Sequence, residues 1–274
     1  MDDIDRFLKE DMNKEGDITS KALFTTQQGK AKLITHEPCV IAGLEEAKEV
    51  FYRTGVSQIE TLVNDGESIP QGTTVLNAKG SLVSLLTGER LALNFICRMS
   101  GIATETKKLV DICSSINPQC TIAATRKTTP GFRKYEKKAV VLGGGEPHRF
   151  GLYDAFLIKD NHIQGVGSLT KAIQQVQKQS KRKIIEVEVE TREQATQAAH
   201  LGVDCIMLDN FHPEEGKKVA DCIKEINPSI LIEVSGGITR ENIASYASFA
   251  DRISLGYLTH SVRSIDFSLD VAPR

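Results

Sequence analysis

The sequence predicts an α/β protein with two regions of different character. In the first region, short runs of β-forming residues are separated by turn-forming residues and interrupted by helices. After Asn117-Pro118, apolar β-type runs alternate with amphipathic helical segments, and the last four runs recur every 20 to 26 residues. Such alternation is typical of parallel strands joined by helical crossovers. The chain of 274 residues, 40% of them hydrophobic, is long enough for one or two domains.

The first region is typical of an α+β arrangement. Turn chemistry such as Asn64-Asp65-Gly66 separates the β-type runs, and helices are predicted over residues 44–52 and 88–114. In the longer helix, Ala92, Phe95 and Met99 belong to an apolar stripe with spacings of three and four. The expected strands are Lys32–Thr35, Gln58–Val63, Thr73–Leu76 and Ser81–Leu86.

The second region predicts a parallel sheet. Its expected strands are Thr121–Thr125, Ala155–Ile158, Ile184–Val189, Cys205–Leu208, Ile230–Val234 and Arg252–Leu255. A right-handed series of strand and helix units either closes into a barrel or opens into a doubly wound sheet. About 150 residues are too few for a full eight-fold barrel of roughly 250, which leaves an incomplete barrel as one of the two arrangements.

Composition excludes several classes of partner. The 36 acidic and 34 basic side chains give a net charge of −2, so no global field attracts nucleic acid or an anionic membrane. Aromatic residues make up 5% of the chain and Trp is absent, which disfavours a base-stacking platform. No run approaches the roughly 18 apolar residues of a membrane span, and the acidic N-terminus lacks the apolar core of a signal peptide. The six cysteines form no C-x-x-C pair, which disfavours a zinc site or a disulfide framework, and a cytoplasmic protein is expected.

Acidic side chains mark two neighbouring strand ends. Glu186, Glu188 and Glu190 project from one face of their strand and valines from the other, because side chains in a strand have a period of two. The alternative is a strand with one solvated face. The next strand ends at Asp209-Asn210, where a carboxylate and an amide would hold a ribose diol or a hydrated Mg²⁺. The alternative at this position is a helix N-cap.

Glycine-bearing turns follow the last two strands. Ser235-Gly236-Gly237 stands between a strand and a helix expected from about Arg240, and Gly256 follows the final strand. Glycine lets backbone N–H groups approach an anion, and the start of a helix adds partial positive charge. Paired turns at these places match the common phosphate site of α/β barrels.

The densest basic region runs from residue 126 to residue 159 and holds eight basic and three acidic side chains. Four of the basic residues lie on the polar face of a predicted helix and are expected to be solvated: Arg133, Lys134, Lys137 and Lys138. The other four, together with His148, stand at strand ends or beside a glycine loop: Arg126, Lys127, Arg149 and Lys159. They suit a ligand with several anionic groups, because Arg offers a planar fork and Lys a point charge.

The set contains no obvious nucleophile. Cations, a phosphate cradle and two carboxylates favour positioning and electrostatic stabilisation over covalent catalysis. Phosphoribosyl transfer needs this arrangement, because carboxylates stabilise an oxocarbenium-like sugar while cations hold diphosphate and an acidic base.

Motifs spread in order over nearly the whole chain carry a specific resemblance. They include Gly88-Glu89-Arg90-Leu91-Ala92-Leu93-Asn94, Thr125-Arg126-Lys127-Thr128-Thr129-Pro130-Gly131, His148-Arg149, Leu157-Ile158-Lys159-Asp160-Asn161-His162, Glu186-Val187-Glu188-Val189-Glu190, Leu208-Asp209-Asn210-Phe211 and Ser235-Gly236-Gly237-Ile238. Together they resemble the quinolinate phosphoribosyltransferases, also called carboxylating nicotinate-nucleotide pyrophosphorylases.

The resemblance implies an N-terminal α/β sandwich over residues 1–115, to which the tail 265–274 returns. It also implies an incomplete, open-faced α/β barrel over residues 116–264. The implied reaction is Mg²⁺-dependent transfer of phosphoribosyl from phosphoribosyl pyrophosphate to quinolinate, which gives nicotinate mononucleotide, CO₂ and pyrophosphate. The implied assembly is a homodimer or a larger assembly of such dimers.

The resemblance also assigns roles to individual residues. Quinolinate would be bound by Arg90 from the partner subunit and by Thr125, Arg126, Lys127, His148, Arg149 and Lys159. Phosphoribosyl pyrophosphate would be bound by Lys159, Glu188, Asp209, Ser235, Gly236, Gly237 and Gly256. The catalytic residues would be Lys127, Glu188 and Asp209, and the last two would hold Mg²⁺, directly or through water.

Two alternatives stay open at this stage. Many members of the family have Asn directly before the His-Arg pair, whereas this chain has Glu146-Pro147. A paralogous group linked to molybdenum transport shares Pro-His-Arg but is expected to lack the residue equivalent to Lys159. The other alternative, a non-catalytic nucleotide-binding regulator, would bind these ligands without turnover.

Overall fold

The computed structural model describes residues 2–180 and 182–273 and divides into two compact units. Unit 1 consists of Met1–Glu105, Lys134–Gly143 and Val262–Arg274, and unit 2 consists of Thr106–Arg133 and Gly144–Ser261. The boundary falls ten residues before the one expected at residue 116. Residues 134–143 group with unit 1 because Glu136 binds Arg98, and Lys138 binds Glu46, through ion pairs.

Unit 1 is built on an antiparallel sheet with the strand order β12-β1-β5-β3. Its strands are β1 (Gln28–Thr35), β2 (Cys39–Val40), β3 (Gln58–Thr61), β4 (Ser68–Ile69), β5 (Thr74–Ser81) and β12 (Phe267–Pro273). Its helices are α1 (Asp3–Met12), α2 (Ile18–Leu23), α3 (Leu44–Arg53), most of α5 (Arg133–Leu142) and the first part of α4 (Leu82–Ile116). The C-terminal tail returns to this unit, because β12 pairs with β1 along its whole length.

The prediction of a strand over Ser81–Leu86 is wrong. Ser81 ends β5, and helix α4 begins at Leu82. The Ser81 hydroxyl accepts a hydrogen bond from the Ser84 backbone N–H at 3.0 Å, which is how serine caps the start of a helix. Leu82 and Leu85, three residues apart, are both buried, as the helical period requires.

The expected solvation of the basic residues on α5 is also wrong in part. Lys137 is 2% exposed, and Lys138 reaches both Glu46 and Asp65. Acidic partners in unit 1 neutralise the Lys138 charge, and periodicity within one helix cannot reveal such partners.

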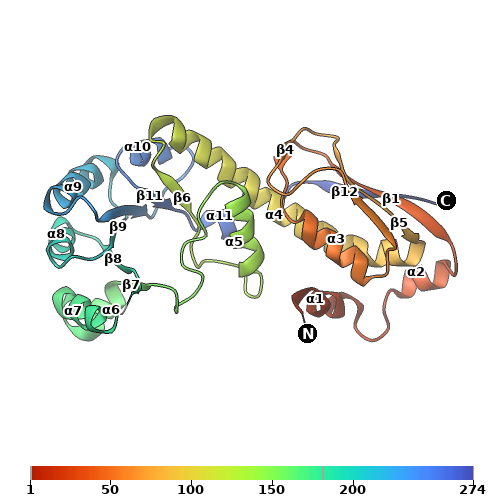
Figure 1. The fold of residues 1–274 in the computed structure, drawn as a ribbon, viewed down its shortest axis with the longest axis horizontal. Helices are drawn as coiled ribbons and strands as arrows, with labels where there is room; N and C mark the ends of the chain where they lie inside the picture. Colours follow the sequence, from red (N-terminus) through yellow and green to blue (C-terminus); the bar gives the residue numbers. More distant parts are fainter. Residues whose placement is uncertain (1, 181, 274) are drawn as a thin grey trace. The chain divides into compact units, whose positions relative to one another are not determined.

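Unit 2 is an open barrel of six parallel strands in the order β6-β11-β10-β9-β8-β7. The strands are β6 (Thr121–Ala123), β7 (Phe156–Ile158), β8 (Ile185–Val189), β9 (Cys205–Asp209), β10 (Leu231–Ser235) and β11 (Arg252–Ser254). The helices are the end of α4 and α6 (Asp160–Val166), α7 (Leu169–Gln179), α8 (Arg192–His200), α9 (Pro213–Ile226), α10 (Ile243–Ala247) and α11 (Tyr257–His260). Figure 1 shows α7, α8 and α9 along one side of β7, β8 and β9. Strands β7 to β11 lie side by side in chain order and β6 joins β11, whereas the strand order of a doubly wound sheet reverses at its middle. The incomplete barrel is therefore confirmed and the doubly wound alternative is excluded.

The helical core of unit 2 forms on one face of the sheet. Val187, Ile206 and Ile232 lie side by side on adjacent strands, and all are fully buried in the cluster that the helices cover. Among the helices that the structure describes, none combines the length and apolarity that a membrane span needs.

Candidate active site

The inner face of the barrel carries polar side chains at matching levels of neighbouring strands. Glu188 pairs in register with Met207, and Met207 pairs with Glu233. Glu233 pairs in turn with Arg252. The interpretation of β8 as a strand with one solvated face is wrong, since Glu186 on its acidic face is 2% exposed.

Glu188, Met207 and Glu233 form part of the wall of a cavity of about 550 Å³, and every residue that lines it belongs to unit 2. All the sequence-predicted site residues except Arg90 line it: Thr125, Arg126, Lys127, His148, Arg149, Lys159, Glu188, Asp209, Ser235, Gly236, Gly237 and Gly256. Arg90 is an exposed residue of α4 in unit 1 and is not among the lining residues. The structure thus brings the expected cations, acids and glycines into one cavity.

Two of the cations, Arg126 and Lys127, follow β6, and hydrogen bonds fix the backbone at Lys127. The Lys127 N–H donates to the Thr125 hydroxyl at 3.0 Å, and the Lys127 carbonyl accepts from the Thr259 hydroxyl at 2.7 Å. The Nε of Arg126 is buried and has no hydrogen-bond partner among the described residues. A buried donor without an acceptor is costly, so an anion next to Arg126 would be favoured. Burial and nearby Arg126 lower the pKa of Arg149, which indicates a crowded positive region.

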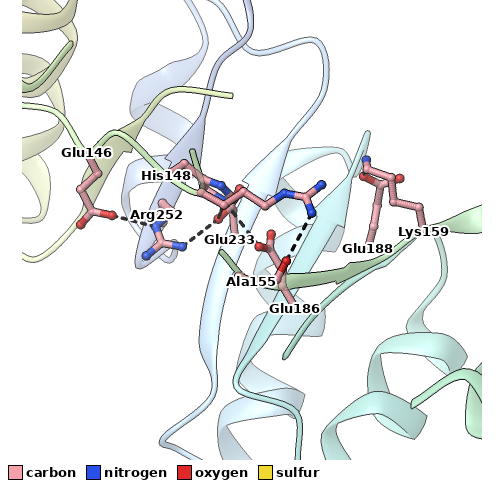
Figure 2. Close-up of polar contacts among 9 residues, drawn as sticks. Glu146, His148, Ala155, Lys159, Glu186, Glu188, Glu233 and Arg252 are labelled. Atoms are coloured by element: carbon pink, nitrogen blue, oxygen red, sulfur yellow. Dashed lines mark hydrogen bonds and ion pairs between the residues drawn. The ribbon is translucent and has the colours of Figure 1, made fainter. Parts of the chain in front are cut away.

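The acids stand at the ends of β8 and β9. Lys159, directly after β7, forms an ion pair with Glu188 (Figure 2). Asp209 accepts a hydrogen bond from the Asn210 amide at 2.7 Å, and burial together with neighbouring Glu188 raises the pKa of Asp209. The alternative of a helix N-cap at Asp209 or Asn210 is wrong, because His212 occupies the N-cap of α9.

The glycine turn after β10 needs glycine. Gly236 and Gly237 have φ angles of +90° and +60°, a left-handed conformation that costs other residues energy. A Cβ on Gly236 would lie 2.2 Å from Oδ1 of Asn210. The helix expected from Arg240 begins at Ile243 and has five residues, so the anion-binding argument rests on the turn and not on a helix dipole.

Beneath these groups lies a cluster that the sequence did not predict. His148 Nε2 is 3.2 Å from Oε2 of Glu233 and 3.4 Å from Oε2 of Glu186. Arg252 contacts the same Glu233 oxygen at 3.2 Å and Glu146 at 3.0 Å, and Figure 2 shows the chain of contacts. Glu146, the departure from the family pattern, is therefore a partner of Arg252. The sequence did contain one signal that could have revealed Glu233. The period of two along β10 places Glu233 on the same face as Ser235.

The cluster fixes both the backbone conformation and the charge of His148. His148 has a left-handed φ of +52°, which costs a non-glycine residue about 1–3 kcal/mol and persists only where surrounding contacts hold it. Burial opposes a charge on the ring, but the hydrogen bonds to Glu186 and Glu233 outweigh burial and raise the pKa of His148 to about 9. Burial raises the pKa of Glu186, whereas contacts with His148 and Arg252 hold the pKa of Glu233 below its ordinary value despite burial.

Comparison with known proteins gives relatives along the whole chain. The chain is 44% identical over 262 residues to the probable carboxylating nicotinate-nucleotide pyrophosphorylase of Archaeoglobus fulgidus, covering 93% of this chain and 98% of that protein. It is 41% identical over 281 residues to the carboxylating nicotinate-nucleotide pyrophosphorylase of Mycobacterium leprae, covering 98% and 96% of the two chains.

Solved structures and family models indicate the same family as the sequence relatives. The crystal structure of NadC from Streptococcus pyogenes has a TM-score of 0.91 to this chain at 39% identity, covering 99% of this chain and 95% of that one. The quinolinate phosphoribosyl transferase N-terminal domain matches residues 17–100, and the corresponding C-terminal domain matches residues 102–270. The chain therefore belongs to the quinolinate phosphoribosyltransferase family.

Proposed function

We propose that the cavity of unit 2 is the active site in which this enzyme transfers phosphoribosyl to quinolinate and forms nicotinate mononucleotide, CO₂ and pyrophosphate. The observation that carries the proposal is the meeting of Lys127, Arg149 and Lys159 with Glu188 and Asp209 in one cavity. Cations would bind the two carboxylates of quinolinate. Acids would bind the ribose hydroxyls of phosphoribosyl pyrophosphate, and a glycine turn would bind its 5′-phosphate. The cavity supplies both sets side by side.

The quinolinate subsite is assigned to Thr125, Arg126, Lys127, His148, Arg149 and Lys159. Guanidinium and ammonium groups bind carboxylates through charge-assisted hydrogen bonds. The unpartnered Nε of Arg126 supports this assignment, because a substrate carboxylate would supply its missing acceptor.

The phosphoribosyl pyrophosphate subsite is assigned to Lys159, Glu188, Asp209, Ser235, Gly236, Gly237 and Gly256. Glu188 and Asp209 would hold the ribose hydroxyls and Mg²⁺, whose preferred ligands are carboxylate oxygens and water. Both acids come from adjacent strands and line the same cavity, so the donor set fits that ion. When bound, Mg²⁺ would neutralise charge on the pyrophosphate.

The chemistry follows from positioning. The pyridine nitrogen forms a bond to C1 of the ribose as the bond to pyrophosphate breaks, and pyrophosphate leaves with the electron pair. Glu188 and Asp209 would stabilise the oxocarbenium-like centre between them. The cationic ring then draws electrons from its C2 carboxylate, CO₂ leaves, and the pair left on C2 takes up a proton. Tight binding of the leaving carboxylate would oppose its loss, so the cations act mainly on the carboxylate that stays.

The test of function is product formation by the purified protein. With quinolinate, phosphoribosyl pyrophosphate and Mg²⁺, we expect nicotinate mononucleotide, CO₂ and pyrophosphate in equal amounts. Nicotinate serves as the comparison substrate and is expected to react far more slowly, because it lacks the second carboxylate. Binding of both substrates without turnover would instead support a regulator, and turnover of another anionic heterocycle would support a paralogous transferase.

Asp209→Asn is expected to raise KM for phosphoribosyl pyrophosphate by roughly tenfold or more, and KM for quinolinate much less, because it removes a charged ligand from the sugar subsite. Steady-state kinetics with each substrate varied in turn measure the two values. Asp221→Asn is the matched control, since Asp221 is an exposed acid of α9 that pairs with Lys217. A larger effect on quinolinate would show that the two subsites are exchanged.

A homodimer would explain Arg90. We propose that this exposed arginine enters the quinolinate subsite of a partner subunit. If so, an equal mixture of Arg90→Ala and Lys159→Ala subunits should regain about a quarter of wild-type activity, because half the dimers are mixed and one site in each is intact. Activity is measured after the subunits are exchanged and mixed dimers are verified by mass spectrometry. Verified mixed dimers without activity would place Arg90 outside the site.

A cytoplasmic location is proposed as well. It is supported by the free state of all six cysteines, since a reducing compartment keeps thiols unpaired.

A further inference from the structure

The buried charge cluster consists of His148, Glu146, Glu186, Glu233 and Arg252. Its contacts join the loop before β7 to strands β8, β10 and β11 of the barrel. The side chains of Glu186 and Glu233 are 3% and 0% exposed, so both carboxylates are shielded from water. His148 and Glu233 also line the cavity. The cluster therefore forms part of the wall against which the substrate would lie.

The two glutamates determine which atoms of His148 can meet a ligand. Both Oε2 atoms converge on Nε2, so Nε2 must carry a proton and donate it. Within residues 2–180 and 182–273, the other ring nitrogen, Nδ1, has no hydrogen-bond partner. Neutral imidazole has one N–H, whereas imidazolium has two. With Nε2–H given to the glutamates, only the charged ring also has an Nδ1–H to donate to an anion.

A divalent metal ion explains the same geometry less well. The ligand atoms of His148, Glu186 and Glu233 lie within 4.8 Å of one another, which is close enough for a metal site. However, Arg252 lies 3.2 Å from the Glu233 oxygen that would bind the ion. A guanidinium at this distance would repel a metal cation, whereas an imidazolium carries only a single positive charge that two carboxylates already balance. The geometry favours a proton over a metal ion.

We infer that Glu186 and Glu233 are positioning residues that aim His148 and keep it an imidazolium, so that its Nδ1–H binds a carboxylate of quinolinate. The inference rests on the proposed assignment of His148 to the quinolinate subsite. Arg252 contacts the same Glu233 oxygen as His148 and helps to keep that carboxylate charged, whereas Glu146 contacts Arg252 and lies outside the positioning arrangement. Because both glutamate side chains are almost fully buried and their Oε2 atoms face Nε2 of His148, they act through His148.

Titratable and charged groups lie on every element packed around His148, and of these Glu186 and Glu233 act directly on its charge. The groups are Glu186 on β8, Cys205 on β9, Glu233 on β10, Arg252 on β11, and Glu146 and Arg149 in the loop. Burial and the two glutamates raise the pKa of the Cys205 thiol, so this group stays neutral. Since the carboxylates favour the charged ring, replacing either one should lower the pKa of His148. Quinolinate binding should then weaken at a lower pH than in the wild-type enzyme.

The test compares Glu233→Gln, Glu186→Gln and the control Glu146→Gln in the full-length enzyme. The control removes a carboxylate from the same cluster that contacts Arg252 but not His148. At pH 8 we expect the first two to weaken quinolinate binding by about tenfold or more, with little change in KM for phosphoribosyl pyrophosphate. The control should change quinolinate binding much less. Isothermal titration with quinolinate from pH 6 to pH 10 should show loss of affinity near pH 9 for wild type and at lower pH for the two test variants.

A double-mutant cycle separates positioning from a structural role. In a His148→Gln background, Glu233→Gln should cause little further loss of quinolinate affinity, because the group it positions is gone. Thermal unfolding of each variant reports on folding, and Glu186→Gln carries the test where Glu233→Gln does not fold. Glu233→Asp, which keeps the charge, should restore part of the affinity.

Several results would overturn the inference. One is that the losses of quinolinate affinity from His148→Gln and Glu233→Gln add in the double variant. The others are that the pH dependence of quinolinate affinity is unchanged in the glutamine variants, or that these variants mainly raise KM for phosphoribosyl pyrophosphate. A stoichiometric metal ion in the purified enzyme that is lost with Glu233→Gln would make the cluster a metal centre. Normal quinolinate affinity of His148→Gln would instead refute the assignment of His148 to the subsite. Failure of the proposed function would be distinct, because the wild-type enzyme would then form no nicotinate mononucleotide.

Discussion

Lys127→Ala is expected to lower kcat/KM for quinolinate by about 10- to 150-fold without lowering the Tm. A charge-assisted hydrogen bond contributes about 1.5–3 kcal/mol, and Lys127 supplies such a donor to the cavity. The fold should survive because the contacts of Lys127 with Thr125 and Thr259 use its backbone, which alanine keeps. Steady-state kinetics and thermal unfolding of the same preparation measure both quantities.

Lys218→Ala is the matched control for that substitution. Lys218 is an exposed residue of α9 that does not line the cavity, so its loss removes the same charge from the protein without touching the site. If the two variants have equal kinetics, the effect of Lys127 is one of net charge, and Lys127 has no place in the quinolinate subsite.

Gly236→Ala is expected to reduce kcat/KM for phosphoribosyl pyrophosphate by about 100-fold or more. Its Cβ would lie 2.2 Å from Oδ1 and 2.9 Å from the backbone N of Asn210, so the turn must move. A displacement of about 1 Å at a positioning group can cost about 100-fold in rate. Because Asn210 also donates to Asp209, the overlap disturbs the acid as well as the turn.

Gly237→Ala separates this overlap from backbone strain. Gly237 also has a positive φ, but a Cβ there meets no atom within 4 Å among the described residues. It should therefore show only the strain of about 1–2 kcal/mol in the free energy of unfolding and a smaller kinetic effect. Similar kinetics for the two alanine variants would mean that strain dominates and that close packing on Asn210 is not what requires glycine.

The structure changes how two predicted features are explained. Turn glycines were expected to act together with a helix start, but α10 is too short and begins too late for a substantial dipole. In the proposed site, backbone N–H groups of the turn would therefore bind the phosphate without help from a helix dipole. Lys159 was expected to serve both subsites, and the structure shows an ion pair between it and Glu188, an acid of the proposed phosphoribosyl pyrophosphate subsite.

The sequence by itself determined which residues at the ends of the barrel strands reach the cavity. Parallel strands with helical crossovers put all their carboxyl ends at one edge, so residues as distant as Arg126 and Gly256 meet there. The period of two along β8 placed Glu186 and Glu188 on one face. These rules act within one strand or one crossover, and they need no knowledge of neighbouring strands.

Only the tertiary structure decided how those side chains pair. The buried charge cluster depends on the register of β10 with β11 and on the approach of the loop that carries His148 to β8 and β10. Lys137, likewise, is buried although the period of α5 alone predicts a solvated side chain. The physical reason is that a charge becomes stable inside a protein only when partners from distant segments surround it, and local patterns carry no record of those partners.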